Sequence, residues 1–218
     1  NSFPMAVQAM GEIMGIKGRV FPVTTDKNTL TAELSDGSRV FGESAIDIPR
    51  GQNRAMIKNV FLVPHHCDEI QVYSPVLEAI AKANFIILGP GDLYTSILPN
   101  LLVPRVADAI KKSEAWLSYV VNIMTKYGET NNFKVMDFIL KLEEKIGRQI
   151  DLAMINDTKP PENLLESYKK ELAFWVEKPD NLDSFGKREV LLADMLESTE
   201  LLRHSAEKLQ KIFQRVFF

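Results

Sequence analysis

Between residues 84 and 156, three short apolar runs alternate with helical segments, and this alternation limits the possible folds of the chain. The apolar runs are NFIILG, LSYVVN and IDLAMIN, and segments with helical spacing separate them. Strands that alternate with helices build parallel sheets through right-handed crossovers, and runs this apolar are typical of strands covered on both faces. We therefore predict an α/β fold, a Rossmann-like three-layer sandwich around a mainly parallel sheet.

An antiparallel portion precedes this alternation. The runs NTLTAEL and SRVFGES flank the pair Asp36 and Gly37, which is a hairpin signal, and IKNVFLVP adds a further strand. A chain of 218 residues is long enough for one α/β domain with a sizeable core but short for two full domains. We expect a single domain over residues 1–218, with a small antiparallel β-hairpin insertion, residues 17–62, inside it.

The individual elements follow from periodicity, caps and breakers. Helices are predicted over residues 3–15, 74–83, 104–113, 133–147, 161–172 and from about 205 to the end. Strands are predicted over residues 18–24, 28–34, 38–44, 57–64, 84–89, 117–122, 150–156, 173–177 and 188–194. The Met-rich first helix is expected in the core or in an interface.

Composition narrows the function classes. The chain is 45% hydrophobic and 25% charged, as average globular domains are, and its net charge of −3 comes from interspersed acids and bases. This pattern disfavours a nucleic-acid surface. No run approaches the roughly 20 apolar residues that span a bilayer, and the lone Cys67 fits a reducing compartment. We expect a cytoplasmic protein with no membrane span and no nucleic-acid partner.

Two polar loops follow neighbouring strands of the predicted parallel sheet. GPGDLYTSILPN comes after the strand at 84–88, and NIMTKYGETNN comes after the strand at 117–121. Ligands of open parallel sheets bind beyond the carboxyl ends of the strands. Both loops are therefore candidates for one binding site.

The first loop has the residues of an anion-binding turn. Gly89 and Gly91 can take conformations that let consecutive N–H groups converge, and Thr95 and Ser96 can donate from their hydroxyls. Such a loop suits a phosphate or diphosphate. Gly-Pro-Gly after a strand is also common turn chemistry, however, and the residue types leave both interpretations open. Because Asp92 repels a diphosphate, it predicts either a bridging Mg²⁺ held by Asp92 or a contact with ribose-type hydroxyls.

The second loop carries Asn122, Thr125, Glu129 and Thr130 around a turn that Gly128 permits. These polar groups can bind a base or a sugar. Alternatively, Glu129 and Thr130 only cap the helix that follows.

Two further features of the run HHCDE are expected to carry no chemistry. Its five side chains, His65 to Glu69, can all ligate a metal, but adjacent residues of an extended chain point in alternating directions and metal motifs space their ligands. Cys67 has no neighbouring motif that would activate it as a nucleophile. We therefore expect neither a metal site nor a thiol enzyme here.

The two loops and their flanking blocks resemble the bacterial gluconeogenesis-factor (YvcK-like) family, within the superfamily that includes the 2-phospho-L-lactate transferases (CofD-like). The blocks are GIKGRVFPVT, LTAELSDGS, FGES, ILGPGDLYTSILPNLLVP and VNIMTKYGET, in family order between about Met5 and about Asn156. The transferase branch tends to have Gly-Pro-Ser-Asn-Pro at the first loop. Gly-Pro-Gly-Asp followed by Leu-Tyr-Thr-Ser is similar to the gluconeogenesis-factor branch.

This resemblance implies a cytoplasmic protein that binds a UDP-sugar, notably UDP-N-acetylglucosamine, and helps maintain cell shape during growth on gluconeogenic carbon sources. No catalytic residue is implied. A binding protein without turnover is therefore the first expectation, and a transferase with a nucleotide-diphosphate donor is the alternative. Mg²⁺ is expected only together with a bound nucleotide diphosphate, and a homodimer is expected by analogy.

The resemblance also implies which residues bind. The phosphate-side loop would comprise Gly89, Pro90, Gly91, Asp92, Tyr94, Thr95 and Ser96, and the neighbouring wall would comprise Asn122, Thr125, Gly128, Glu129 and Thr130. Three positions depart from the family pattern: Asp92 stands where many members have serine, Lys126-Tyr127 replaces the commoner Gln-Pro, and Arg105 replaces a common glycine at a helix start. Lys126 is expected to supply a positive charge that offsets Asp92.

Family members normally open with a strand and a Gly-Gly-Gly-Thr-Gly loop, and no such segment precedes Asn1 in this sequence. We therefore expect the chain to correspond to the C-terminal portion of such a protein.

Overall fold

The structure, a computed structural model, describes residues 2–49 and 53–218. Its centre is a four-stranded sheet in the order β4-β5-β6-β7, and each neighbouring pair is parallel. The strands are Phe85–Leu88, Trp116–Val120, Leu152–Asn156 and Glu189–Ala193. The parallel sheet predicted from the alternation of apolar runs and helices is confirmed.

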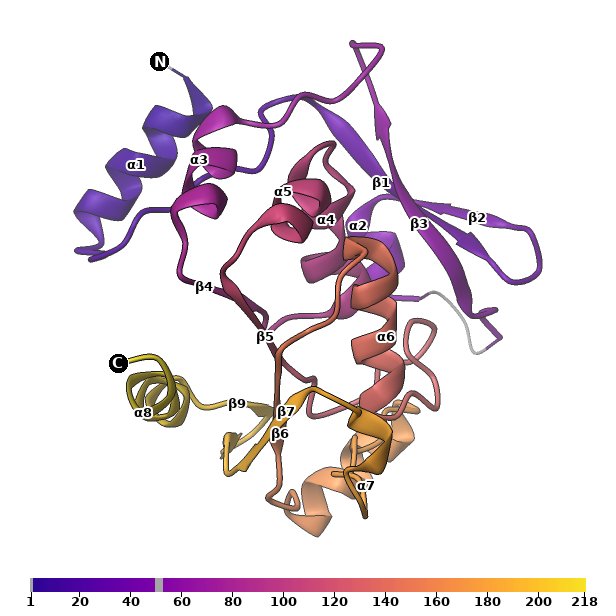
Figure 1. Cartoon of the computed structure of the whole chain (residues 1–218). Helices are drawn as coiled ribbons and strands as arrows, with labels where there is room; N and C mark the ends of the chain where they lie inside the picture. The colour runs from indigo at the N-terminus through magenta and orange to yellow at the C-terminus, as the bar shows by residue number, and fades with distance from the viewer. Residues whose placement is uncertain (1, 50–52) are drawn as a thin grey trace.

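Helices cover both faces of this sheet, and together they make three layers (Figure 1). Successive residues of a strand point to opposite faces, so Leu117 and Tyr119 of β5 belong to one core and Val120 to the other. On the first face lie α4 (Leu98–Leu102), α5 (Val106–Lys112) and α6 (Val135–Ile146). On the second face lies α8 (Ala206–Phe217), whose apolar side packs on β5 and β6.

A separate antiparallel sheet in the order β2-β1-β3 lies at one side of the molecule (Figure 1). It is formed by Arg39–Phe41, Asn28–Leu34 and Ile57–Pro64. The predicted hairpin turn is present: the N–H of Gly37, whose φ is +83°, donates to Leu34 O at 3.0 Å. The short α2 (Glu43–Asp47) follows β2 and contacts β1, and α4 contacts β3, which joins this sheet to the first core.

The other elements surround these two sheets. α1 (Phe3–Ile13) lies beside α3 (Ser74–Lys82) in Figure 1, and α7 (Glu162–Lys170) follows β6. Two short strands, β8 (Leu196–Ser198) and β9 (Leu202–His204), pair antiparallel just before α8. Within the described ranges, no helix combines the length and hydrophobicity that a bilayer crossing requires.

Several local predictions are wrong, mostly because a strand needs a partner that its own sequence does not specify. Residues 18–24 make no strand, only the single bridge between Thr24 and Val72, and residues 173–177 make only the bridge between Met124 and Trp175. Residues 42–44 of the predicted strand 38–44 lead into α2 instead. The pair β8 and β9 was not predicted.

Two further predictions need correction. Part of the loop predicted after β4 is helical, because Leu93–Ile97 folds into a π-helical turn that continues directly into α4. The first helix does not lie in the core: none of the residues of α1 is buried, and Met5, Met10 and Met14 are all exposed.

Candidate functional site

The two predicted loops lie side by side, because each follows one of two neighbouring parallel strands. Leu88, at the end of β4, pairs with Tyr119 near the end of β5. Beyond this point the Asn122 amide donates to the carbonyl oxygen of Gly91 at 3.0 Å, while the Tyr119 hydroxyl donates to Asn122 Oδ1 at 2.7 Å. We call residues 89–96 and 122–130 the two-loop site.

The glycines of the first loop are needed for close backbone approach. Gly89 has φ of +79°, and a Cβ there would lie 3.2 Å from the backbone oxygen of Val120. A Cβ on Gly91 would lie 3.1 Å from Ser96 Cβ. Within the described part of the chain, the N–H groups of Gly91 and Asp92 donate no hydrogen bond, and both residues are partly exposed.

Hydrogen bonds of Thr125, Thr130 and Gly128 fix the second loop, and those of Thr125 join it to Phe174 in another segment. Thr125 N donates to Phe174 O at 2.7 Å, and Phe174 N donates back to Thr125 Oγ1 at 2.8 Å. The Thr130 hydroxyl accepts from Lys126 N at 2.9 Å. Gly128, with φ of +77°, donates its N–H to Asn131 Oδ1 at 2.6 Å. These contacts hold Lys126 and Glu129 in place.

Three carboxylates from different segments converge on the ammonium group of Lys126. It contacts Asp47 at the end of α2, Asp92 Oδ2 of the first loop at 2.7 Å, and Glu129 Oε1 of the second loop at 3.4 Å. The Thr95 hydroxyl also donates to Asp47, at 3.4 Å. We call Asp47, Asp92 and Glu129 the carboxylate cluster. Lys126 and Asp92 form an ion pair, so the expected offset of charge is present, but the same ammonium also serves two further acids.

Glu129 is the most deeply buried member of the carboxylate cluster, with 1% of its surface exposed. Neither of its oxygens has a hydrogen-bond partner among the residues that the structure describes. Burial raises the pKa of this carboxyl to about 7, although Lys126 opposes the shift. For Lys126 itself, burial lowers the pKa, but hydrogen bonds to Asp47 and Asp92 outweigh this and leave its pKa raised.

A second cation, Arg54, stands beside the second loop. Its guanidinium donates to Ile46 O at 2.6 Å, and its backbone N–H donates to the Tyr127 hydroxyl at 3.0 Å. Burial lowers the pKa of Arg54, and the charge of Glu129 opposes that shift. Asp47 and Arg54 were not among the predicted site residues. Asp47 lies in the run IDIPR, and Arg54 follows a few residues later. This stretch contains no motif that would have identified either residue as part of a site.

The remaining predicted residues of the first loop differ in exposure. Tyr94 is buried in the first core, and burial raises the pKa of its phenol to about 12, so it stays protonated at neutral pH. Pro90 and Ser96 are exposed at the surface of the loop.

In the described part of the chain, no group of three or more His, Cys, Asp or Glu side chains is placed to hold a metal ion. An oxygen of Asp92, the residue predicted to hold Mg²⁺, faces the ammonium of Lys126. In the HHCDE run, His65 Nε2 lies 2.6 Å from the Thr29 hydroxyl, and Cys67 is an exposed free thiol.

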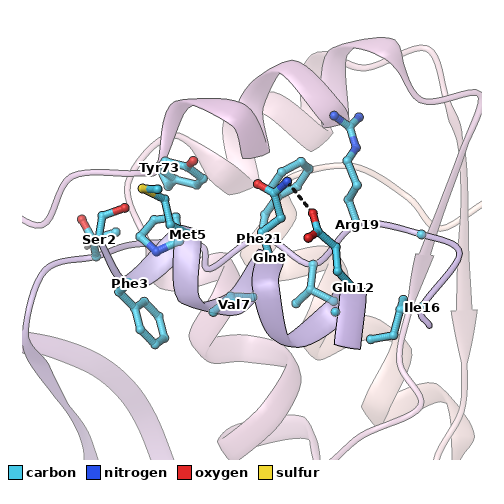
Figure 2. A pocket seen from close by; sticks show the side chains of 15 residues that line it. Ser2, Phe3, Met5, Val7, Gln8, Glu12, Ile16, Arg19, Phe21 and Tyr73 are labelled. Carbon is cyan, nitrogen blue, oxygen red and sulfur yellow. Dashed lines mark hydrogen bonds between the residues drawn. The ribbon is translucent and has the colours of Figure 1, made fainter. Parts of the chain in front are cut away.

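A different hollow, of about 740 Å³, lies between α1 and the segment that follows it (Figure 2). Figure 2 shows apolar side chains such as Phe3, Val7 and Ile16 around it, and Gln8 donates to Glu12 at 3.1 Å. It lacks the clustered acids and bases of the two-loop site.

A family model agrees with these observations over most of the chain. The model described as "2-phospho-L-lactate transferase CofD" matches residues 1–196. That range includes the whole two-loop site and all three members of the carboxylate cluster.

Relatives and a solved structure support the same grouping. The chain is 36% identical to a "Gluconeogenesis factor" of Listeria innocua over 95% of its length and 62% of the relative's. It is 34% identical to a "Gluconeogenesis factor" of Halalkalibacterium halodurans, over 97% of the chain and 64% of the relative. A crystal structure of a UPF0052 family protein from Bacillus halodurans matches with a TM-score of 0.86 and 32% identity, over 97% of this chain and 66% of that one. The chain thus spans a little less than two thirds of the length of these relatives.

Proposed function

The chain belongs to the CofD family, among proteins named gluconeogenesis factors, and from this premise we propose that it binds a nucleotide-diphosphate sugar across the two-loop site. The ligand class we propose is a UDP-sugar of the UDP-N-acetylglucosamine type. The observation that carries the proposal is the pairing of free backbone N–H groups in the first loop with the carboxylate cluster beside them.

The diphosphate would lie on the first loop. The N–H groups of Gly91 and Asp92 have no partner among the described residues, and adjacent free N–H groups of a turn form a concavity that binds anions. The exposed hydroxyl of Ser96 adds a donor to the same loop. Because Lys126 neutralises part of the charge of Asp92, the repulsion of a diphosphate is smaller than the loop sequence alone indicates.

The carboxylate cluster would bind the hydroxyl groups of a sugar. Ionised carboxylates accept hydrogen bonds and do not donate them. Asp47 and Asp92 remain partly exposed, with 29% and 41% of their side-chain surfaces accessible, so their remaining oxygens can receive hydroxyl donors. This division places acceptors beside the sugar and donors beside the diphosphate.

Calorimetry of the chain with UDP-N-acetylglucosamine, UDP-glucose and GDP, each with and without Mg²⁺, tests the proposal. We expect the UDP-sugars to bind with one site per chain. Asn122→Ala removes the hydrogen bond that joins the two loops, so this variant should bind the UDP-sugars more weakly. Asn163→Ala on α7 should bind them as the unmodified chain does. Absence of binding to all three nucleotides would refute the proposal.

The alternative function is transfer of a group from a nucleotide-diphosphate donor. The description of the matching family model favours it, and so does Glu129, because a carboxyl group with a pKa of about 7 suits general acid or base catalysis near neutral pH. Binding of GDP together with transfer to a deazaflavin acceptor, lost in Glu129→Gln, would favour this function over binding alone.

We further propose a cytoplasmic role in cell shape during growth on gluconeogenic carbon sources, and a homodimeric state. Complementation of a strain that lacks its own gluconeogenesis factor tests the role: the unmodified chain should restore shape and Asn122→Ala should not. Light scattering coupled to size exclusion tests the dimer, and a monomeric mass would refute it.

A further inference from the structure

The position of Lys126 within the carboxylate cluster is the observation that goes beyond nucleotide binding. Its ammonium nitrogen touches Asp47, lies 2.7 Å from Asp92 Oδ2, and lies 3.4 Å from Glu129 Oε1. These three acids come from three segments of the chain: α2, the loop after β4 and the loop after β5. The ammonium therefore occupies the common centre of three oxygen donors.

Oxygen donors in this arrangement are those that hard divalent cations prefer. Mg²⁺, Mn²⁺ and Ca²⁺ are bound by carboxylate oxygens, and the three groups paired with Lys126 are all carboxylates. As it stands, however, the cluster does not fit a metal ion, because no such group of ligands occurs in the described residues and the central position is filled. The Lys126 contacts with Asp92 and Glu129, at 2.7 and 3.4 Å, are longer than the metal-oxygen distances of roughly 2.0–2.6 Å.

The charge balance shows why something must occupy this centre. Without Lys126, the three acids would share a partly buried region whose remaining described cation is Arg54, on the Glu129 side. Glu129 is the independent indication that this centre needs a cation: it is 1% exposed, it lies 3.4 Å from the Lys126 ammonium, and its oxygens have no hydrogen-bond partner among the described residues. Buried carboxylates are stable only when paired, protonated or bound to a cation.

We propose that Lys126 is a tethered substitute for a divalent cation, so that this chain takes its nucleotide diphosphate without metal, and that removing the ammonium converts the carboxylate cluster into a divalent-metal site. The first clause, on the nucleotide, rests on the proposed function. The second clause does not, because it concerns only the chain and the metal.

Titration with Mn²⁺ alone, followed by calorimetry and by the electron paramagnetic resonance signal of free Mn²⁺, tests the metal clause. Lys126→Gln removes the charge but keeps an amide that can donate to the acids, so the fold should survive. We expect this variant to bind one Mn²⁺ per chain at least about tenfold more tightly than the unmodified chain does. The double variant Lys126→Gln/Glu129→Gln should lose that gain.

Two matched variants serve as controls. Lys58→Gln removes a lysine that pairs with a single carboxylate, Glu33, on the antiparallel sheet, and Lys126→Arg keeps the positive charge in the cluster. Neither should gain Mn²⁺ affinity. Equal Mn²⁺ affinity in the unmodified chain and in Lys126→Gln would overturn the proposal, as would a gain that persists when Glu129 is neutralised.

If Lys126→Gln is unstable, its thermal unfolding with and without Mn²⁺ decides the matter. The proposal requires Mn²⁺ to raise the melting temperature of this variant and not that of Lys58→Gln, and no rise would overturn it. The nucleotide clause is tested separately: UDP-N-acetylglucosamine should bind the unmodified chain equally in Mg²⁺ and in EDTA, and strict Mg²⁺ dependence would overturn it. Failure of every nucleotide to bind would refute the proposed function and the nucleotide clause, while the Mn²⁺ result would still decide the metal clause.

Discussion

The side-chain amide of Asn122 donates a hydrogen bond to the carbonyl oxygen of Gly91, 3.0 Å away, and so joins the loop after β5 to the loop after β4. The same Asn122 accepts a hydrogen bond from the hydroxyl of Tyr119, a fully buried residue of β5. This bond fixes the orientation of the Asn122 side chain relative to the sheet. The relative position of the two loops is therefore set by the core and not by the loops themselves.

We expect Asn122→Ala to loosen this connection and to leave the buried Tyr119 hydroxyl unpaired. Loss of the two hydrogen bonds should lower the free energy of unfolding by about 1–3 kcal/mol. Urea denaturation measures this change. Asn163→Ala on the exposed side of α7 is the control and should change stability by less than about 0.5 kcal/mol. Equal stability of the two variants would contradict the structural role of Asn122.

Gly89 and Gly37 form a matched pair for testing close packing of the first loop. Both have positive φ, +79° and +83°, but a Cβ on Gly89 would lie 3.2 Å from Val120 O whereas a Cβ on Gly37 would meet open space. Gly37→Ala should cost about 0.5–1 kcal/mol, because a backbone strain of about 1–2 kcal/mol is partly offset by the greater freedom of glycine in the unfolded chain. Gly89→Ala should cost more, because the backbone of β5 must also shift. Urea denaturation of both variants measures the two losses of stability. A larger loss in Gly37→Ala than in Gly89→Ala would contradict the structure.

Glu129 should make the stability of the chain depend on pH. Burial raises its folded pKa to about 7, above its ordinary value of 4.5, so the protonated form favours the folded state. Its contribution is fully present below pH 4.5 and is lost as the pH rises through 7. Relative to Glu129→Gln, which does not titrate, the unmodified chain should lose about 2 kcal/mol of unfolding free energy between pH 5 and pH 8.

Urea denaturation of both proteins at several pH values measures this difference. Titrating groups that do not interact with Glu129 contribute equally to both proteins, so those contributions cancel. A difference between them that stays constant from pH 5 to pH 8 would show that Glu129 has an ordinary pKa.

Arg105 is an exposed non-glycine residue with φ of +73°, directly before α5. The left-handed conformation costs a residue with a side chain about 1–2 kcal/mol, whereas glycine there loses only about 0.5–1 kcal/mol through its greater freedom in the unfolded chain. Arg105→Gly should therefore stabilise the chain by about 0.5 kcal/mol. Asp108→Gly, inside the same helix, should instead destabilise it by up to about 1 kcal/mol. A loss of stability in Arg105→Gly would contradict the observed backbone conformation.

Most of the parallel sheet could be predicted from the sequence, because the patterns that indicate its strands and helices are local. Apolar runs such as IDLAMIN indicate that a strand is buried on both faces. The helical segments between successive runs indicate that the strands pair in parallel. From that order alone, the loops after β4 and β5 had to lie at the same edge. The segment at 18–24 shows the limit: its composition is that of a strand, but only pairing makes a strand, and apart from the bridge between Thr24 and Val72 it has none.

Local sequence patterns were therefore enough to predict the α/β architecture, the hairpin at Asp36-Gly37 and the adjacency of GPGDLYTSILPN and NIMTKYGETNN. They could not predict that Asp47, 79 residues before Lys126, completes the carboxylate cluster, or that Glu129 is buried there, because both depend on the packing of distant segments. Periodicity and turn residues act over a few positions of the chain. The charge state of a buried carboxyl, and the ion that neutralises it, depend on segments brought together by the packing of the two sheets.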